Sequence, residues 1–364
     1  MTAYITINGR FLTQSITGVQ RYAIEIVKAL DNLFDAGDID PDQISFELLA
    51  PRGANCDLRL KHIPLRCVGH LSGHLWEQFE LPFYVGRKPL ISLCNAAPLL
   101  KRNQIVTIHD ASVFANPRTY PFAFRAWYKF LLRGICRAAR KIVTDSSFSK
   151  SEIMRYCGID ESRIQVILLG KEHIFAVPAD AGIIERNQLS EKPYILAVSS
   201  VTPNKNFRSI VRAIELLDKV DFDIVIAGGA NPRVFSQSDL SLPDTVKHLG
   251  YVSDGELRAL YEHAACFVFP SFYEGFGLPP LEAMACGCPV IVSNAASLPE
   301  VCGDAALYCD PHSPEDIAAK ISQLIHDPAL QDDLRGKGLE RAALYSWDKT
   351  AKMTMEVLEE ALDE

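Results

Sequence analysis

Both halves of this sequence alternate short apolar runs with longer amphipathic segments, a rhythm typical of βαβ units and parallel sheets. At 364 residues the chain is too long for one ordinary core, so we expect two domains of this kind. In the first half the pattern predicts strands at 3–7, 45–50, 90–94, 104–109, 141–144 and 164–168, and helices at 19–33, 121–139 and 147–157. In the second half it predicts strands at 194–198, 223–227, 246–249, 266–269 and 289–292, helices at 207–217 and 253–264, and only helices after residue 310.

The stretch between the two halves, residues 171–192, is polar and irregular and contains Pro178, so we interpret it as a linker. The first domain then covers residues 1–170 and the second covers residues 193–345. We expect the final helix, at 346–364, to pack back on the first domain. Two doubly wound domains would bind ligands in a cleft at the carboxyl ends of their strands, where loops and helix N-termini converge.

The composition excludes several classes of function. A net charge of −8 argues against nucleic acid as the main partner, because phosphate backbones require basic surfaces. The N-terminus lacks a signal-peptide pattern, and no apolar stretch is long enough to span a bilayer, so we expect a cytoplasmic protein with reduced cysteines. Cys286 and Cys288 could form half of a metal site, but no second pair lies at zinc-site spacing, and packing of small residues explains them more simply.

The most specific motif lies at residues 269–292, FPSFYEGFGLPPLEAMACGCPVIV. A Gly-rich turn containing Glu274 follows an apolar strand and opens a helix that carries Glu282. Such a turn offers an anion backbone N–H groups and the positive end of a helix dipole, while Glu282 would reach hydroxyl groups of the same ligand. This arrangement suits a nucleotide sugar. Alternatively Glu274 caps the helix, since acids favour first turns, but capping requires neither two glycines nor a second acid.

Residues 269–292 resemble the donor-binding signature of retaining glycosyltransferases of family 4. The resemblance covers essentially the whole chain and implies the α/β fold known as GT-B, with two doubly wound Rossmann-like domains facing a central cleft. It implies that Glu282 holds the ribose hydroxyls of the nucleotide and that Glu274 lies near the hydroxyls of the transferred sugar. It further implies that the sugar and diphosphate touch the backbone of Gly275, Phe276, Gly277 and Leu278.

A cationic site follows the first strand of the second half, in the sequence SSVTPNKN at residues 199–206. Lys205 stands where the family usually places the lysine that neutralises the donor diphosphate. Relatives often have an arginine before this lysine, and some have another just after the strand. This chain has Asn204 and a serine pair instead, so the resemblance implies one cation at the diphosphate unless Arg208 turns inward. The alternative is an ordinary exposed loop lysine.

A glycine loop with Gly18 precedes the first helix, in LTQSITGVQRY at residues 12–22. In the family, the corresponding loop closes over the donor phosphates, whereas a plain turn would explain a lone glycine equally well.

His109 and Asp110 follow the apolar strand at 104–108. His109 resembles the family histidine that contacts the sugar and its leaving phosphate, and Asp110 resembles the residue that shapes the acceptor side. The alternative is a structural His–Asp pair that holds a loop.

Residues 118–141 carry seven basic side chains and no acidic one, interleaved with aromatic residues. A basic helix with aromatics can lie at an anionic membrane surface, and members of the family that act on lipid-linked sugars often dock through this domain. The alternative is an ordinary domain helix whose aromatics fill the core and whose arginines face water.

The resemblance implies transfer of a hexose from a nucleoside diphosphate sugar with retention of configuration, to a lipid-linked or saccharide acceptor in surface polysaccharide synthesis. AGGANPRVF at residues 227–235 looks most like mannosyl- and rhamnosyl-transferring members, so GDP-mannose is the first donor expected. No Asp-x-Asp lies near the donor motif, and Lys205 with helix N-termini can stabilise the leaving diphosphate, so we expect no metal. Two alternatives remain: a nucleotide-sugar epimerase, which lacks the spacing of the two glutamates, and a non-catalytic scaffold.

Overall fold

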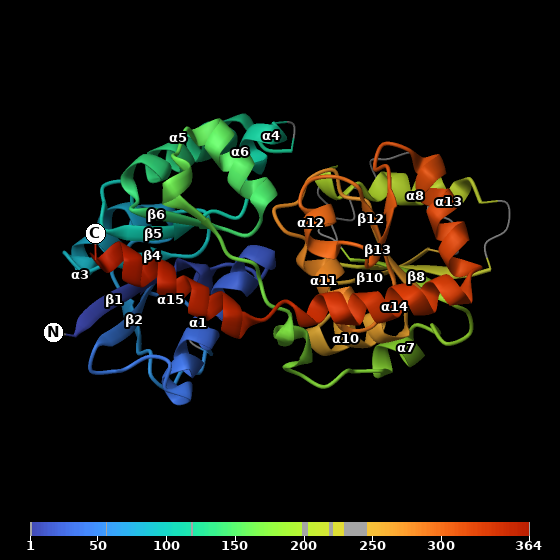
Figure 1. Cartoon of the computed structure of the whole chain (residues 1–364), viewed down its shortest axis with the longest axis horizontal. Coiled ribbons are helices and arrows are strands. Elements are labelled where there is room, and N and C mark those ends of the chain that lie inside the picture. Colours follow the sequence, from blue (N-terminus) through green and yellow to red (C-terminus); the bar gives the residue numbers. More distant parts are fainter. Residues whose placement is uncertain are drawn as a thin grey trace. The chain divides into compact units, whose positions relative to one another are not determined.

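The structure is a computed structural model that describes residues 2–55, 57–117, 119–198, 203–217, 221–228 and 246–363. The chain forms two compact units. The first comprises Met1–Gly170 together with Ser346–Glu364, and the second comprises Lys171–Tyr345 (Figure 1). None of the described helices combines the length and the apolar character needed to cross a bilayer. Three stretches used in the sequence predictions, namely Arg118, 199–202 and 229–235, lie outside the described residues.

The first unit is built on a seven-stranded parallel sheet with the order β3-β2-β1-β4-β5-β6-β7. Its strands are β1 (Ala3–Asn8), β2 (Ile44–Pro51), β3 (Leu65–Val68), β4 (Leu90–Ser92), β5 (Gln104–Thr107), β6 (Lys141–Thr144) and β7 (Ile164–Val166). The chain moves outward from β1 to β3 and then returns to pair β4 with β1, Ile7 lying opposite Ile91. This reversal is a topological switch point, where the carboxyl ends of neighbouring strands are open to ligands.

The longer helices of the first unit are α1 (Gly18–Ala36), α5 (Phe122–Ala138), α6 (Ser147–Cys157) and α15 (Trp347–Asp363), and the short ones are α2 (Gly73–Leu75), α3 (Leu81–Val85) and α4 (Ser112–Ala115). The C-terminal helix α15 packs beside α1 (Figure 1). The Thr350 hydroxyl donates a hydrogen bond of 2.7 Å to the Leu168 carbonyl, and the Arg140 guanidinium donates to the carbonyl of Ala361. These bonds fasten α15 to the first unit at both of its ends.

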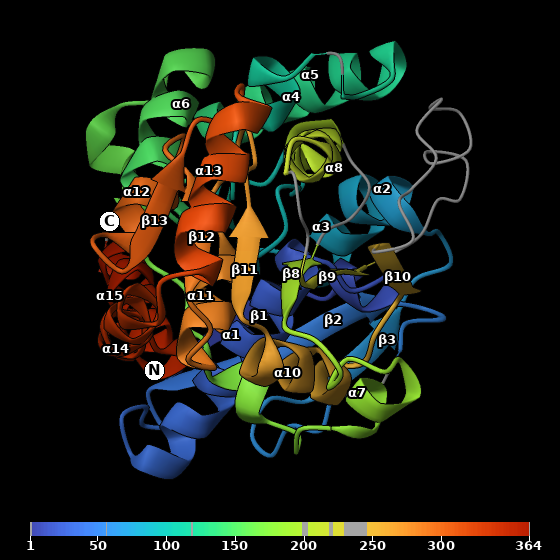
Figure 2. The same ribbon diagram turned by 90° about the vertical axis from the view of Figure 1, so that its right-hand side faces the viewer.

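The second unit contains a six-stranded parallel sheet with the order β10-β9-β8-β11-β12-β13 (Figure 2). Its strands are β8 (Tyr194–Val198), β9 (Asp223–Ala227), β10 (Val246–Gly250), β11 (Cys266–Phe269), β12 (Val290–Ser293) and β13 (Ala306–Cys309). Its helices are α7 (Gly182–Arg186), α8 (Phe207–Glu215), α10 (Asp254–His263), α11 (Leu278–Ala285), α12 (Leu298–Cys302), α13 (Pro314–Ile325) and α14 (Pro328–Ala343). The switch point lies between β8 and β11, which are hydrogen-bonded neighbours.

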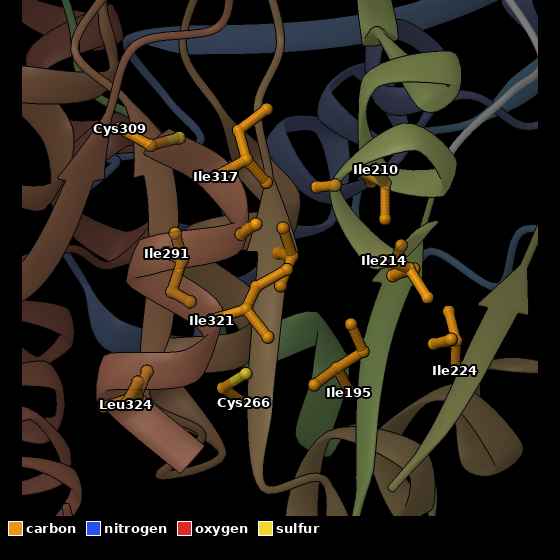
Figure 3. Close-up of a cluster of buried hydrophobic side chains, with 14 of the residues drawn as sticks. Ile195, Ile210, Ile214, Ile224, Cys266, Ile291, Cys309, Ile317, Ile321 and Leu324 are labelled. Atoms are coloured by element: carbon orange, nitrogen blue, oxygen red, sulfur yellow. The ribbon is translucent and has the colours of Figure 1, made fainter. Parts of the chain in front are cut away.

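One core of the second unit lies between the sheet and the pair of helices α8 and α13 (Figure 3). Ile291 of β12 and Ile321 of α13 are fully buried there. Both faces of a parallel sheet are covered by helices, which explains why β11 and β12 read as continuous apolar runs rather than alternating ones. The start of α10 is capped by side chains, since Ser253 and Glu256 form a reciprocal capping box.

The structure differs from the sequence prediction between the two halves. Residues 171–192 are not a free linker but part of the second unit, with two short helices, η4 (Glu172–Phe175) and α7. Ile174, Ile183 and Ile184 are buried, and the Asp180 N–H donates to the Gly255 carbonyl at 2.9 Å. A few apolar residues in a polar stretch are enough to attach it to α10. The sequence prediction also lacked β3, β13 and the helical segment from α2 to α3.

We expect Ile321→Ala to lower the free energy of unfolding of the second unit by about 2–5 kcal/mol, because it leaves a cavity in a packed core. Far-UV circular dichroism in urea would measure this change. Trp76, Trp127 and Trp347 all belong to the first unit, so tryptophan fluorescence follows that unit separately.

Leu339→Ala is the matched control, because Leu339 is exposed on α14. Its effect on the free energy of unfolding should stay within about 0.5 kcal/mol. Equal losses for the two variants would contradict the assignment of Ile321 to the core.

Candidate active site

Lys205 and Glu274 meet at the switch point of the second sheet. Lys205 ends the short helix η5 (Pro203–Lys205) after β8, and Glu274 lies in the loop after β11. Because the carboxyl ends of neighbouring parallel strands share one edge, the two loops are adjacent. The Lys205 ammonium lies 2.7 and 2.8 Å from the two oxygens of the Glu274 carboxylate, and both side chains are mostly buried. Sequence analysis singled out each residue alone, and the structure joins them.

Asn206 fixes the backbone on which Lys205 stands. It adopts a left-handed conformation with φ of 58° at the start of α8, a conformation that asparagine tolerates better than most residues. Its buried side-chain amide donates to the carbonyls of Pro270 and Pro311, at 3.0 and 2.6 Å. The Phe272 N–H donates to the Asn204 carbonyl at 2.9 Å. These bonds tie the loop after β8 to the loop after β11.

The Gly-rich loop has a defined shape. Gly277 has φ of +106°, and a Cβ there would come within 2.6 Å of a methyl carbon of Leu298, so only glycine fits. The Ser297 hydroxyl lies 3.0 Å from the carbonyl oxygen of Glu274 and 2.8 Å from that of Phe276, and it holds the loop from inside. Residues 279 and 280 are both proline and have no N–H. The backbone N–H groups ahead of the two prolines belong to residues 275–278, and the Leu281 N–H after them donates to the Gly277 carbonyl.

Glu282 lies in the second turn of α11, and its carboxylate is held by two buried donors. His173 Nε2 lies 2.7 Å from Oε1, and the Tyr261 hydroxyl lies 3.2 Å from Oε2. Burial, and then the Glu282 carboxylate, raise the pKa of Tyr261 well above its usual value, so Tyr261 remains a phenol that can donate. The remaining donor-site candidate of this unit, Arg208, is exposed on the first turn of α8.

In the first unit, His109 pairs with Asp145 and not with Asp110. His109 follows β5 and Asp145 follows β6, and these strands are neighbours. His109 Nδ1 lies 2.6 Å from the Asp145 carboxylate, and Nε2 lies 3.0 Å from the Leu93 carbonyl. The protonated form of His109 donates from both ring nitrogens to these two partners and carries a positive charge. Burial opposes that charge, but Asp145 and the Leu93 carbonyl outweigh it and raise the pKa of His109.

Asp110 and Gly18 lie at helix starts of the first unit. The Asp110 carboxylate accepts a 2.8 Å hydrogen bond from the Ser112 N–H and so shapes the start of α4. Gly18 is the first residue of α1, and a Cβ built on it would meet nothing within 4 Å. Packing within the unit therefore does not explain why residue 18 is glycine.

A buried ionic cluster near the end of β1 was missed by sequence analysis. The Glu77 carboxylate accepts from the Asn8 amide at 2.8 Å and from the Arg10 guanidinium at 2.9 Å, and His74 Nδ1 lies 3.1 Å away. Burial opposes ionisation of Glu77, but hydrogen bonds and the nearby positive charges prevail and lower its pKa. The residues come from two segments far apart in the sequence, 8–10 and 74–77, so no local motif reveals the cluster.

Comparisons with known proteins identify the family. An O-antigen chain mannosyltransferase B from Escherichia coli is 31% identical, over 93% of this chain and 95% of its own length. The family model described as Glycosyl transferases group 1 matches residues 182–341, and the model described as Glycosyltransferase Family 4 matches residues 74–170. The chain belongs to glycosyltransferase family 4. Another similar protein is an O-antigen chain mannosyltransferase from Salmonella typhimurium, 27% identical over 94% of this chain and 96% of its own.

Solved structures confirm the expected GT-B fold of this glycosyltransferase. A sucrose-phosphate synthase from Thermosynechococcus elongatus superposes with a TM-score of 0.77 at 19% identity, covering 99% of both chains. The Anabaena protein HepE, solved in complex with UDP and glucose, has a TM-score of 0.76 at 17% identity, covering 98% of this chain and all of its own.

Three polar residues of the transferase lie at these sites without having been predicted: Asp145, His173 and Tyr261. Asp145 directly follows a predicted strand. Polar residues in that position are candidates for a ligand site, so Asp145 could have been predicted from the sequence. His173 lay in the segment interpreted as a linker, and Tyr261 resembled a core residue of an amphipathic helix. For those two the sequence carries no local signal.

The raised pKa of His109 predicts how stability depends on pH. A group whose folded-state pKa is raised stabilises the fold fully below its unfolded value, about 6.5 for histidine, and loses that contribution as pH rises through the folded value. Asp145→Asn removes the charge that raises the pKa of His109. We therefore expect the difference in free energy of unfolding between wild type and Asp145→Asn to be largest below about pH 6.5 and to narrow as the pH rises through the raised pKa of His109, as measured by urea unfolding.

Asp333→Asn serves as the control, since Asp333 forms an exposed ion pair with Lys337 on α14. Its small effect should not change over the same range. If the difference in free energy of unfolding between wild type and Asp145→Asn stays constant or widens as the pH rises, Asp145 does not raise the pKa of His109.

Proposed function

We propose that this glycosyltransferase moves a hexose, with mannose from GDP-mannose as the first candidate, to a lipid-linked or saccharide acceptor in surface polysaccharide synthesis. The observation that carries this proposal is the clustering of Lys205, Glu274 and the Gly-rich loop at one switch point. The O-antigen mannosyltransferases among the relatives support the choice of mannose and of this class of product. The complex of HepE with UDP and glucose supports a nucleotide-sugar donor.

In this proposal each donor-site residue has one task. Glu282 accepts the ribose hydroxyls, Glu274 accepts sugar hydroxyls, and the backbone of 275–278 contacts sugar and diphosphate. Lys205 has three N–H donors, two of which are directed at Glu274. The third can bind a phosphate oxygen, so Lys205 separates the Glu274 carboxylate from the negative charge of the donor. The positive charge of Lys205, held in this position, can stabilise the leaving diphosphate. We therefore expect activity without a divalent metal.

The proposed transfer retains configuration without a protein nucleophile. The bond between the anomeric carbon and the diphosphate oxygen breaks, and the acceptor oxygen bonds to the same face of the sugar. The acceptor proton passes to the leaving phosphate. We propose that His109 contacts the sugar and the leaving phosphate, that Asp110 shapes the acceptor side, and that Gly18 and Arg208 contribute to the phosphate site. For His109, this requires exchange of its bond to Leu93 for one to substrate.

The nucleotide site is tested with a thermal-shift panel of GDP, UDP, dTDP, ADP and CMP without metal, followed by calorimetry. We expect one diphosphate to stabilise the wild type. Glu282→Ala should weaken its binding by about 1.5–3 kcal/mol, because the ribose loses a charged acceptor.

Exposed Glu315→Ala on α13 should leave the affinity unchanged. An unchanged dissociation constant for Glu282→Ala would remove Glu282 from the nucleotide site. A wild type that binds no nucleotide and turns over no donor would favour a non-catalytic scaffold.

We further propose that α5 makes peripheral contact with an anionic membrane at the cytoplasmic side. Four of its aromatic residues do not fill the core: Phe122 and Phe130 are 75% and 61% exposed, and Phe124 and Trp127 are also exposed, whereas Tyr128 packs partly against the core. The buried residues of α5 are instead Leu131, Leu132, Ile135 and Cys136. Exposed aromatics beside basic residues suit the interface of a bilayer with anionic headgroups.

Vesicle flotation tests this contact. The wild type should bind vesicles containing phosphatidylglycerol more tightly than vesicles of phosphatidylcholine alone, and Phe122→Ser with Phe130→Ser should reduce binding several-fold, since each ring buries apolar area. Tyr251→Ser is the control, because Tyr251 is an exposed aromatic of the second unit. Equal binding by all three proteins would contradict the assignment to α5.

A further inference from the structure

We infer that His173 and Tyr261 are positioning residues that orient Glu282 for two neighbouring ribose hydroxyls, so that the donor site prefers ribonucleotides to 2′-deoxyribonucleotides. This inference rests on the proposed function, in which Glu282 receives the ribose. It goes further because it names the residues that hold the carboxylate and restricts the donor to nucleotides that carry both ribose hydroxyls.

The chemistry of the carboxylate fixes the direction of the two hydrogen bonds at Glu282. A carboxylate can only accept, so His173 carries a hydrogen on Nε2 and donates it to Oε1 of Glu282 over 2.7 Å. The Tyr261 hydroxyl donates to the other oxygen, Oε2, over 3.2 Å. Each oxygen of Glu282 therefore has one protein donor.

The remaining acceptor capacity of Glu282 matches a vicinal diol. A carboxylate has roughly four lone-pair sites, and the residues that the structure describes use one on each oxygen, which leaves one on each oxygen for a ligand. Two hydroxyls on adjacent carbons, as in the 2′ and 3′ positions of ribose, can fill one site each. A 2′-deoxyribose can fill only one, and an acceptor left without a donor in a largely buried place weakens binding.

Glu282 and the two residues that hold it lie on three separate elements of the second unit. His173 lies on η4, where its side chain is 2% exposed and its neighbour Ile174 is buried in the unit. Tyr261 lies on α10, with its ring 5.5 Å from that of Phe267 in an edge-to-face contact. Glu282 lies on α11, and its side chain is 10% exposed. Because the two donors approach different oxygens from different elements, they restrict rotation of the carboxylate.

The bonds at Glu282 narrow the choice of nucleotide. Of the diphosphates in the binding panel proposed above, GDP and UDP carry a full ribose, whereas dTDP does not. The held carboxylate therefore disfavours deoxythymidine diphosphate sugars and fits the proposed GDP-mannose.

The test compares GDP with 2′-deoxy-GDP, and UDP with 2′-deoxy-UDP, by calorimetry on the full chain. For whichever base the protein binds, the wild type should bind the ribonucleotide about tenfold more tightly than its 2′-deoxy form. This is the effect of one unpaired hydrogen-bonding group. His173→Ala should reduce this preference to about twofold, mainly by weakening the ribonucleotide. His173→Gln retains an N–H donor and should keep most of the preference, and His326→Ala, at an exposed site after α13, should keep all of it.

The outcomes separate this inference from the proposed function. If Glu282→Ala loses the preference while His173→Ala and Tyr261→Phe keep it, Glu282 binds ribose but the positioning role is wrong. If the wild type has no preference, or Glu282→Ala keeps it, the ribose site itself is wrong. If His173→Ala fails to fold, Tyr261→Phe decides: a reduced preference at an intact melting temperature supports the inference, and an unchanged preference overturns it.

Discussion

Parallel strands covered on both faces favour charged side chains at the ends of the strands rather than within them. In the second unit, β11 and β12 are buried along their whole length. A charged side chain within such a strand would be desolvated without a partner, at a cost of several kcal/mol. The chemistry of this protein therefore collects where strands end. Lys205, Glu274, His109 and Asp145 all lie beyond the carboxyl ends of their strands.

Burial at these edges in turn requires that charges come in pairs. Lys205 neutralises Glu274, His109 donates to Asp145, and His173 donates to Glu282. A buried pair adds little net stability compared with apolar packing, but loss of one partner leaves an uncompensated charge and is costly. Such pairs are therefore better understood as devices that hold functional groups in one geometry. Glu282 shows this most clearly, since each of its oxygens has a separate donor.

Local signals explain which features could be predicted from the sequence and which could not. The alternation of strands and helices, the Gly-rich loop and the family resemblance predicted the GT-B fold and singled out the residues of the Gly-rich motif, because those signals are local. His173 was not predicted, since nothing in KEHIF at residues 171–175 distinguishes a buried partner of Glu282 from a linker residue. Its proximity to Glu282 depends on Ile174 and the isoleucines of α7, whose burial attaches the supposed linker to the second unit. Likewise, Asp110 adjoins His109 in sequence, but the order of β5 and β6 makes Asp145 its partner.

By itself the sequence determined the class of fold, the position of the Gly-rich turn and the identity of the two motif glutamates, because periodicity and turn chemistry act over a few residues. The strand order of each sheet decided which of the selected residues meet, such as Lys205 with Glu274. Tertiary packing alone decided what Glu282 contacts, because its donors lie 109 and 21 positions away in the chain. Hydrogen bonds depend on distance in space, and local patterns do not encode the folding that brings such positions within about 3 Å of each other.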